Sequence, residues 1–330
     1  MVTRTKGSTW NLEDNSGSVS LLDYEPLKVG TDWSLSFAAA VARAQVIGGA
    51  MQIPGGIYEI SPQVIPAGVL VFGEGTLKAF GTSQGSLLTL AAGAQLKGIT
   101  LNGNNSIVTS GAWSLVSVIN ANNIAIQEVQ FVDASGDCIT ISGAASTQIL
   151  ISDCKFIGFK GNGITINSGD DIIISQCRME APNNAAITGN GIALQSDGSA
   201  ISGISISQLH ARGMKGAGIK LLGIGTRNIT DVMIGQCYIL SSATSGILAT
   251  LVERMNVINS CIKNSTTYGI NLQGDVQFCR ISNSMAVGNV TGMAEVLSGT
   301  TPNNNTFSFN VLSGNTNNTV ITLGVNSVVL

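Results

Sequence analysis

Three carboxylates stand out because each lies beside a short alternating apolar segment or an insertion. Asp137 lies in Gly136-Asp137-Cys138-Ile139-Thr140-Ile141, Asp171 ends Asn167-Ser168-Gly169-Asp170-Asp171, and Glu180 begins the insertion 180–190. Two carboxylates can cleave a glycosidic bond, one as the acid and the other as the base or nucleophile. Asp137, Asp171 and Glu180 are therefore candidate catalytic residues. Each could instead be an ordinary turn residue, because Asp side chains often hydrogen-bond the backbone of a turn.

The elements that must position these carboxylates are repeats of about 25 residues. One series has an Ile, two small polar residues and then a central residue. The central residues are Val129, Cys154, Cys177, Leu209, Cys237, Cys261 and Ser284, at steps of 25, 23, 32, 28, 24 and 23. Such a period is typical of a solenoid, in which each repeat buries its apolar face by stacking on the next.

A second series runs in phase with the first and alternates apolar and other residues. Its members begin at Cys138, Gly163, Gly191, Gly218, Gly246 and Gly269. A period of two over short stretches indicates strands rather than helices. Each repeat is therefore two or three short strands joined by turns, which is one coil of a parallel β-helix. We interpret the cysteines as small apolar side chains that stack inside it.

Composition limits the partners of the chain. Its 330 residues are 44% hydrophobic and 11% charged, which suits a large core in one continuous domain. A formal net charge of -3 argues against nucleic acid as the partner. No apolar run is long enough for a membrane helix, and no apolar core follows the basic residues at the N-terminus, so we expect neither a membrane partner nor a signal peptide.

The six cysteines predict reduced thiols in a protein made in a cytosol. Zinc is the competing interpretation, but the sequence has no close Cys-x-x-Cys pair. We expect no metal and no cofactor.

The chain divides into three parts. Residues 1–30 lack the repeat and are either an attachment arm or a strand laid along the coils. Residues 31–297 form the β-helix, and it begins with a helix at 36–45 that has Asp32 or Ser34 as its N-cap and ends at Gly48-Gly49. This helix would cover the open end of the solenoid.

The C-terminal part, residues 298–330, is rich in Asn and Thr. It has strand-like stretches at Thr306–Leu312, Val320–Leu323 and Ser327–Leu330. We expect it to form the last coil and a cap or subunit-contact segment.

The segment 30–60 resembles the first part of the pectate-lyase-like β-helix superfamily. It has a Gly-Asp turn, an Ala-rich helix, a Gly-Gly pair and a strand pair in which Pro54, Gly56, Tyr58 and Ile60 match the family pattern. The resemblance implies an all-β fold, a right-handed parallel β-helix with a short N-terminal capping helix. One fold hosts many activities, so the reaction has to come from the site residues.

Within this superfamily the chain resembles bacteriophage tailspikes, which lack signal peptides. That resemblance implies a homotrimer in the virion, attached to the tail or baseplate through the N-terminal arm, that binds and hydrolyses bacterial capsule or O-antigen. The alternative is a non-catalytic β-helical spike that serves adhesion or structure. A third possibility, a secreted polysaccharide lyase, is disfavoured because such enzymes would ordinarily carry a signal peptide.

The chain departs from the polygalacturonase branch of the superfamily. Gly136-Asp137-Cys138 has one Asp where that branch has two, and Gly161-Asn162-Gly163 has Asn in place of His. The later Arg-Ile-Lys pattern is reduced to Gly218-Ile219-Lys220. The mechanism of that branch is therefore not intact here.

The repeats place further polar residues near Asp137. We expect Asp137 to stack with Asn162 and Asn190 beside a strand face that includes Lys220, and Arg212 to reach toward the same groove. Asn162, Asn190, Lys220 and Arg212 are thus candidate substrate-binding residues. Asp171 is expected in the turn at the opposite strand edge, about 10 Å from Asp137 by strand rise, which is near the spacing of an inverting pair.

The single histidine is expected on a different face from Asp137. His210 falls in the same outward position as Lys155, Arg178 and Tyr238 in their repeats. We therefore expect a structural or solvated role for it rather than a triad with Asp137.

Overall fold

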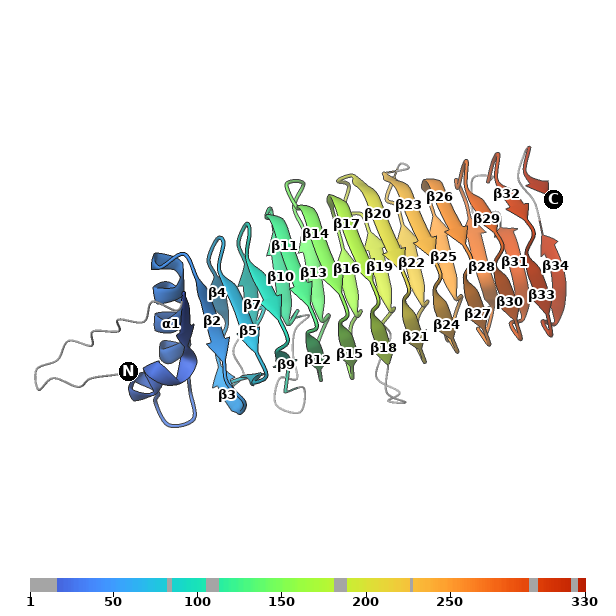
Figure 1. Cartoon of the computed structure of the whole chain (residues 1–330). Coiled ribbons are helices and arrows are strands. Elements are labelled where there is room, and N and C mark those ends of the chain that lie inside the picture. The colour runs from blue at the N-terminus through green and yellow to red at the C-terminus, as the bar shows by residue number, and fades with distance from the viewer. Residues whose placement is uncertain are drawn as a thin grey trace, which may run out of the picture.

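Short strands stack coil upon coil into an elongated solenoid, with a helix at its N-terminal end and the C-terminus at the other (Figure 1). The computed structural model describes residues 17–81, 85–104, 113–180, 189–225, 228–296, 302–321 and 326–330. Residues 1–16 of the expected arm and residues 181–188 of the expected insertion lie outside these ranges. No helix among the described residues has both the length and the apolar character that crossing a membrane requires.

Three sheets run along the solenoid, and the chain visits them in the order A, B, C in each coil. Among the described residues, sheet A has thirteen strands: β1 (Ser18–Ser20), β2 (Ala50–Ile53), β5 (Leu70–Gly73), β8 (Gln95–Lys97), β11 (Asn122–Gln127), β14 (Thr147–Ser152), β17 (Gly169–Ser175), β20 (Ile201–Ser207), β23 (Ile229–Gly235), β26 (Val252–Ile258), β29 (Arg280–Ser282), β32 (Thr306–Ser308) and β35 (Val328–Val329).

Sheets B and C have eleven strands each in the part of the chain that the structure describes. Sheet B contains β3 (Ile57–Ile60), β6 (Thr76–Ala79), β9 (Thr100–Asn102), β12 (Gln130–Val132), β15 (Lys155–Ile157), β18 (Arg178–Glu180), β21 (His210–Arg212), β24 (Tyr238–Leu240), β27 (Cys261–Lys263), β30 (Met285–Val287) and β33 (Val311–Ser313). Sheet C contains β4 (Gln63–Ile65), β7 (Leu88–Leu90), β10 (Val116–Ile119), β13 (Ile139–Ser142), β16 (Ile164–Ile166), β19 (Ile192–Gln195), β22 (Ile219–Leu222), β25 (Ile247–Thr250), β28 (Tyr268–Gln273), β31 (Thr291–Val296) and β34 (Asn317–Ile321).

Equivalent residues of successive coils pair in parallel, so side chains stack in columns. In sheet C, Ile141 pairs with Ile166, and Ile166 pairs with Leu194. Such inward residues are buried, and in sheet B the rings of Phe131 and Phe156 stack with centroids 4.8 Å apart. The expected fold class, a parallel β-helix with a short N-terminal helix, is confirmed.

The N-terminal end is closed as the sequence predicts. Helix α1 (Ser34–Val46) buries Phe37, Val41 and Ala44, and Asp32 Oδ1 accepts the Ser34 N–H at 2.9 Å. The expected N-cap was wrong, because Trp33 and neither Asp32 nor Ser34 is in that position. The Trp33 ring meets Tyr58 edge-on, with centroids 4.9 Å apart. The strands on either side of the turn 54–56 form β2 and β3.

The described part of the expected arm is built into the β-helix. Strand β1 pairs in parallel with β2 and begins sheet A, which agrees with the alternative of a strand laid along the coils. A 3-10 helix, η1 (Leu21–Leu27), follows and packs against α1. At the other end, β32, β33, β34 and β35 add one more strand or pair of strands to each sheet, so the tail continues the coils.

The corner between sheets A and B explains the cysteine series. The thiols of Cys154 and Cys177 are buried and donate to the carbonyls of Ser152 and Ser175, each at 3.2 Å. Ser284 has the same place in a later coil, and its hydroxyl donates to the Ser282 carbonyl at 3.0 Å. A small side chain with a donor thus satisfies a carbonyl at this corner.

One member of the series was assigned wrongly. Tyr238 pairs with Cys261 and Gly235 pairs with Ile258, so the partner of Cys237 in the next coil is Ser260. Cys261 lies in the outward column of sheet B and is only partly buried. The error arose because Ile258 precedes Cys261 at the same spacing that Ile234 has before Cys237, whereas the register aligns Ile234 with Val257.

The glycines of the second series are explained by close stacking at the corner that leads into sheet C. A Cβ on Gly218 would lie 2.8 Å from the Gly246 carbonyl oxygen and 2.4 Å from Ile239 Cγ2. Equivalent Cβ atoms on Gly163, Gly191, Gly246 and Gly269 would lie 2.5 to 2.8 Å from the carbonyl of the next glycine. The corner therefore admits no side chain at these coils.

The cysteine column leads to a first prediction. Cys177→Ala should lower the free energy of unfolding by about 1 kcal/mol through lost packing, whereas Cys177→Asp should prevent folding because it buries a charge. In the native protein a thiol reagent should modify Cys261 first, since burial raises the pKa of the Cys237 thiol to about 11 and that of Cys279 to about 12. Urea unfolding and mass mapping of the modified cysteines measure these effects. Rapid modification of Cys154 or Cys177 would contradict the inward assignment.

A second prediction concerns the glycine column. Gly218→Ala should lower the free energy of unfolding by about 1–3 kcal/mol, because its Cβ would overlap backbone atoms of the next coil. The matched control is Gly235→Ala, whose Cβ would meet Ile258 Cγ1 at an ordinary 3.5 Å. Thermal unfolding of both variants provides the comparison. Equal stability of the two variants would show that the coils can move apart at this corner.

Candidate functional site

Asp137, Asn162 and Asn190 form a ladder at the corner between sheets B and C. Asp137 Oδ1 accepts the Asn162 N–H at 2.6 Å, and Asn162 Oδ1 accepts the Asn190 N–H at 2.8 Å. Asn190 Oδ1 then accepts the Ala217 N–H at 2.8 Å. Each side chain therefore caps the backbone of the next coil, and the expected stacking of these three residues is present.

The second carboxylate oxygen of Asp137 is also bonded. The Thr165 hydroxyl donates to Asp137 Oδ2 at 2.6 Å, and Thr140 donates to the same oxygen at 3.3 Å. A carboxylate whose two oxygens accept these bonds stabilises the corner, and proton transfer to a substrate would require it to give them up. The geometry favours a capping role for Asp137.

Asp171 lies inside strand β17, not in the turn before it. Asp170 pairs with Ser202 and Ile172 pairs with Ile204, so pairing continues on both sides of Asp171. Its φ is 53°, and residues with similar φ recur in the neighbouring strands of sheet A: Gln148, Gly203, Asp231 and Arg254. The expectation of a turn was wrong because a single left-handed residue can bend a strand without ending it.

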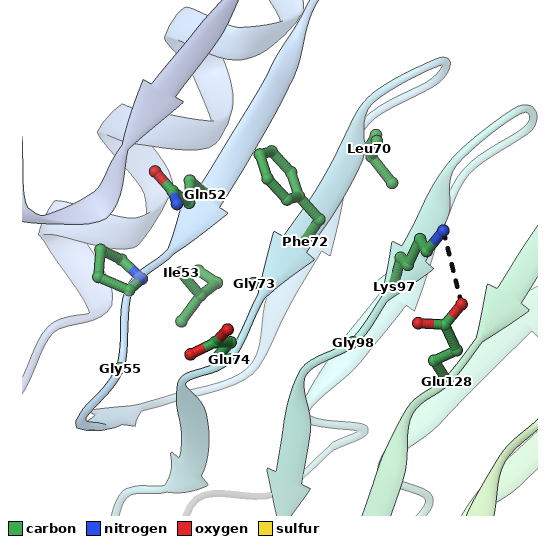
Figure 2. A pocket seen from close by; sticks show the side chains of 11 residues that line it. Gln52, Ile53, Gly55, Leu70, Phe72, Gly73, Glu74, Lys97, Gly98 and Glu128 are labelled. Atoms are coloured by element: carbon green, nitrogen blue, oxygen red, sulfur yellow. Dashed lines mark ion pairs between the residues drawn. The ribbon is translucent and has the colours of Figure 1, made fainter.

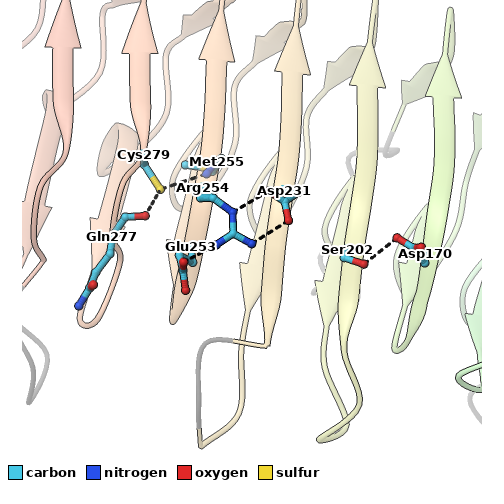
Figure 3. A network of polar contacts seen from close by, with 8 residues as sticks. All are labelled: Asp170, Ser202, Asp231, Glu253, Arg254, Met255, Gln277 and Cys279. Carbon is cyan, nitrogen blue, oxygen red and sulfur yellow. Dashed lines mark hydrogen bonds and ion pairs between the residues drawn. The ribbon is translucent and has the colours of Figure 1, made fainter.

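Polar side chains form a row across sheet A that begins with Asp170, the neighbour of Asp171 in the chain (Figure 3). Asp170 Oδ1 accepts the Ser202 hydroxyl at 2.6 Å, and Arg254 donates from Nε and Nη2 to the two oxygens of Asp231 at 2.7 and 2.8 Å. Glu253 also pairs with Arg254. Exposed pairs of this kind contribute little to stability. Asp137 precedes a strand of sheet C, so the two aspartates belong to different surfaces of the solenoid.

Glu180 lies at the end of β18 on the outward face of sheet B. Arg178 Nε donates to Glu180 Oε1 at 2.8 Å, and Arg212 is the residue paired with Glu180 in the next strand. The Arg178 guanidinium, with smaller contributions from Lys155 and Arg212, holds the pKa of the Glu180 carboxyl below its usual value. Glu180 is therefore ionised at neutral pH.

The same face carries two rings and more cations. His210 and Tyr238 are paired residues with ring centroids 5.2 Å apart, and Lys263 Nζ lies 5.7 Å from the centre of the Tyr238 ring. Burial lowers the pKa of His210, as do Arg178 and Arg212. We call this surface the sheet B strip, and it consists of Lys155, Arg178, Glu180, His210, Arg212, Tyr238 and Lys263. The expected stripe of Lys155, Arg178, His210 and Tyr238 is part of it.

The four candidate substrate-binding residues fall on two surfaces. Lys220 lies on β22 of sheet C, where it pairs with Ala193, which in turn pairs with Thr165 beside the ladder. Asn162 and Asn190 belong to the ladder itself. Arg212 lies on sheet B, across the corner from them and beside Glu180.

A groove that the sequence did not reveal lies at the corner of sheets A and B in the first coils (Figure 2). It encloses about 640 Å³, and its lining includes Phe72, Glu74, Lys97 and Glu128. Lys97 Nζ lies 3.5 Å from Glu128 Oε1. Phe72 is a partly exposed aromatic residue on β5.

The groove exists because glycines leave this corner bare. Gly55, Gly73 and Gly98 all line it, and a Cβ on Gly73 would lie 2.1 Å from the Ile53 carbonyl oxygen. In later coils the left-handed corner position holds longer side chains: Asp153, Gln176, Gln208 and Gln236. Glu128 occupies this position, and it is the first side chain beyond the glycines.

Two carboxylates border the groove from coils that are not adjacent. Glu74 follows β5 and Glu128 follows β11, with β8 between them. The spacing of stacked strands, about 4.8 Å, puts their backbones about 10 Å apart along the solenoid. No sequence signal pointed to this pair, because Glu128 takes an ordinary polar position of the repeat Ile126–Val129 and Glu74 lies before the regular repeats.

The described residues contain no group of three or more His, Cys, Asp or Glu side chains placed to hold a metal ion.

Comparison with known proteins supports the fold through structure rather than sequence. No family model matches the chain, and no curated protein matches it. The A-module of mannuronan C-5 epimerase AlgE4 from Azotobacter vinelandii has a similar structure, with a TM-score of 0.71 and 16% identity. The match covers 94% of this chain and 99% of the epimerase module.

Two tailspike proteins are also similar. The Dettilon tailspike protein has a TM-score of 0.72 and 16% identity over 90% of this chain and 62% of the tailspike. A tailspike from an Acinetobacter baumannii bacteriophage, a capsular polysaccharide depolymerase, has a TM-score of 0.55 and 13% identity over 91% of this chain and 66% of the tailspike. The chain thus spans about two thirds or less of each tailspike. The resemblance inferred from the sequence is confirmed at the level of the fold, a parallel β-solenoid.

The corner ladder leads to a third prediction. Asp137→Ala should lower the free energy of unfolding by about 1–3 kcal/mol, because it leaves the Asn162 N–H and the Thr165 hydroxyl without their acceptor. Asn190→Ala should have a similar effect through the Ala217 N–H. The control is Asp171→Asn, an exposed position where Asn keeps the left-handed backbone and the change should be within about 0.5 kcal/mol. An unchanged urea midpoint for Asp137→Ala would mean that the carboxylate does not cap the corner.

Proposed function

We propose that this chain is the β-helix of a bacteriophage tailspike that binds bacterial surface polysaccharide and hydrolyses it. The observation that carries the proposal is the groove of about 640 Å³, in which an aromatic side chain and two carboxylates face the same space. Hydrolysis of a glycosidic bond needs such a pair, and inverting enzymes keep the two carboxyl groups roughly 6.5–9.5 Å apart. A backbone spacing of about 10 Å is compatible with that range.

The two carboxylates can be given different roles. We assign Glu128, which forms an ion pair with Lys97, the role of the base that activates a water molecule. Glu74 then serves as the acid that protonates the leaving oxygen. Phe72 offers an apolar surface to one face of a sugar ring. No cofactor takes part in this reaction.

The carboxylates proposed from the sequence are second candidates for the same chemistry. Asp137 is engaged in the corner ladder, Asp171 belongs to sheet A, and Glu180 belongs to sheet B. Within one chain no two of them share a sheet. In a homotrimer a neighbouring subunit could complete a pair around one of them, and Glu180 is the best placed because its side chain is ionised on an outward face.

The wider tailspike proposal is supported by the similar solenoids of two tailspike proteins. We propose a homotrimer that belongs to the virion and is attached to the tail or baseplate through the N-terminal residues before Ser18. The glycan is a capsule or an O-antigen on the bacterial surface.

A non-catalytic adhesion or structural spike is the second candidate function. It is favoured by the exposure of the groove carboxylate Glu128, whose side chain is 58% exposed and is paired with Lys97, which is 51% exposed. Such a pair is well solvated and suits binding without catalysis.

The fourth prediction tests hydrolysis. Purified bacterial capsules and O-antigens should yield new reducing ends, with products of one repeat-unit size that carry an added water by mass spectrometry. Glu74→Gln and Glu128→Gln should each lower the rate by about 10²–10⁴ without unfolding the protein. Gln is compatible with the backbone at 128, because Gln176, Gln208 and Gln236 have the same left-handed φ in this chain. Asp197→Asn, at an exposed position outside the groove and the sheet B strip, is the control that should retain activity.

The outcomes of this experiment distinguish a hydrolase from a lyase and from a non-catalytic spike. Products that lack the added water would identify a lyase in place of a hydrolase. Loss of activity in Glu180→Gln but in neither groove variant would move the site to sheet B. Binding without products would favour the adhesion spike, and no binding to any surface polysaccharide would refute the proposal.

A further inference from the structure

We infer that the sheet B strip is a binding surface for acidic polysaccharide, with its cations on the carboxylate, sulfate or phosphate groups of the polymer. The inference rests on the proposed function in taking a polysaccharide as the ligand, and it adds the chemical class of that ligand. It concerns a surface separate from the groove.

The charge of the strip is opposite in sign to that of the whole chain. Lys155, Arg178, Arg212 and Lys263 carry four positive charges, and Glu180 carries one negative charge, whereas the chain has a formal net charge of -3. Only 11% of the residues are charged. A local concentration of one sign on such a surface attracts the opposite charge and raises its association rate.

The geometry of the strip suits an extended polymer. Its residues lie on five successive strands of sheet B, β15, β18, β21, β24 and β27. Four steps of about 4.8 Å make a row about 19 Å long. Lys155, Arg178 and Arg212 are exposed, so they can contact successive anionic groups of a chain laid along the solenoid.

The strip also has a place for a sugar ring between its cations. His210 and Tyr238 present two tilted rings at 5.2 Å, with Lys263 over Tyr238 on one side and Arg178 paired with His210 on the other. Partly buried rings of this kind offer an apolar surface that ends in polar atoms. A sugar with an acidic substituent matches this arrangement, because its ring can pack against His210 or Tyr238 while its charged group pairs with a neighbouring cation.

Within the fold, Glu180 offsets only part of the positive charge of the sheet B strip. Lys155 and Arg178 are directly paired across adjacent strands, and like charges in that position destabilise a sheet. The strands concerned are interior strands of sheet B, so the cations are not needed to protect an edge. An anionic ligand would relieve the repulsion.

The test compares binding of polymers that differ in charge. Wild-type protein should bind polygalacturonate or dextran sulfate but not neutral dextran, and its affinity should fall at least about tenfold when salt rises from about 0.05 to 0.5 M. The triple variant Lys155→Gln, Arg212→Gln, Lys263→Gln should lose at least about 30-fold in affinity. Preference for one of the two polymers identifies the anionic group.

A matched variant controls for net charge. The control is the triple variant Lys28→Gln, Arg43→Gln, Arg280→Gln, which also removes three positive charges but from the end of η1, from α1 and from sheet A. It should bind the acidic polymers like wild type. Circular dichroism of both triple variants checks that the solenoid is intact. Equal losses in the two variants, or binding of neutral dextran as tight as that of the acidic polymers, would overturn the inference.

The experiments distinguish failure of the proposed hydrolysis from failure of the inference about the sheet B strip. Hydrolysis of a bacterial glycan that is unaffected by the strip variant would keep the proposed function and refute the strip. Binding of acidic polymers that depends on the strip, with no hydrolysis of any glycan, would keep the strip and refute the hydrolase.

Discussion

Hydrogen bonding between successive coils is the constraint on which the rest of this structure depends. Each strand pairs in parallel with the equivalent strand of the next coil, so every position becomes a column with a spacing of about 4.8 Å. A side chain is compatible with the fold only if it fits beside the equivalent side chains of the neighbouring coils. Apolar residues line the inside, and polar residues on the outside repeat at the same spacing along the solenoid.

The corners meet this constraint in three ways. Small thiols and hydroxyls satisfy carbonyls between sheets A and B, as Cys177 and Ser284 do. Asp137 and two asparagines cap the coils before sheet C, and glycines then admit the close approach of the next backbone. Where glycines instead occupy the corner between sheets A and B, no side chain fills the space, and the groove is the result. The stacking of equivalent residues thus explains both the filled corners and the groove.

Most of the surface is uncharged, so the ligands that it can bind depend on its few charged residues. With so few charged residues, the positions of the charges matter more than their number. The groove holds two carboxylates and a lysine near the N-terminal end, and the sheet B strip holds four cations over the middle coils. Gln130, on the coil of Glu128, is paired with Lys155, the first residue of the strip, so the two surfaces lie on adjoining coils.

The sequence by itself determined the repeat, the parallel β-helix, the capping helix and the stacking of Asp137 with Asn162 and Asn190, because each of these follows from residues that recur at a local period. It could not place Cys261 or Asp171 correctly, since register and a left-handed bend within a strand depend on the pairing of the neighbouring coil. It also could not reveal that Glu74 and Glu128 share a groove or that Glu180 lies beside Arg212. Those pairs are formed by strand stacking between residues far apart in the chain, and only the tertiary structure decides which columns meet at an open corner.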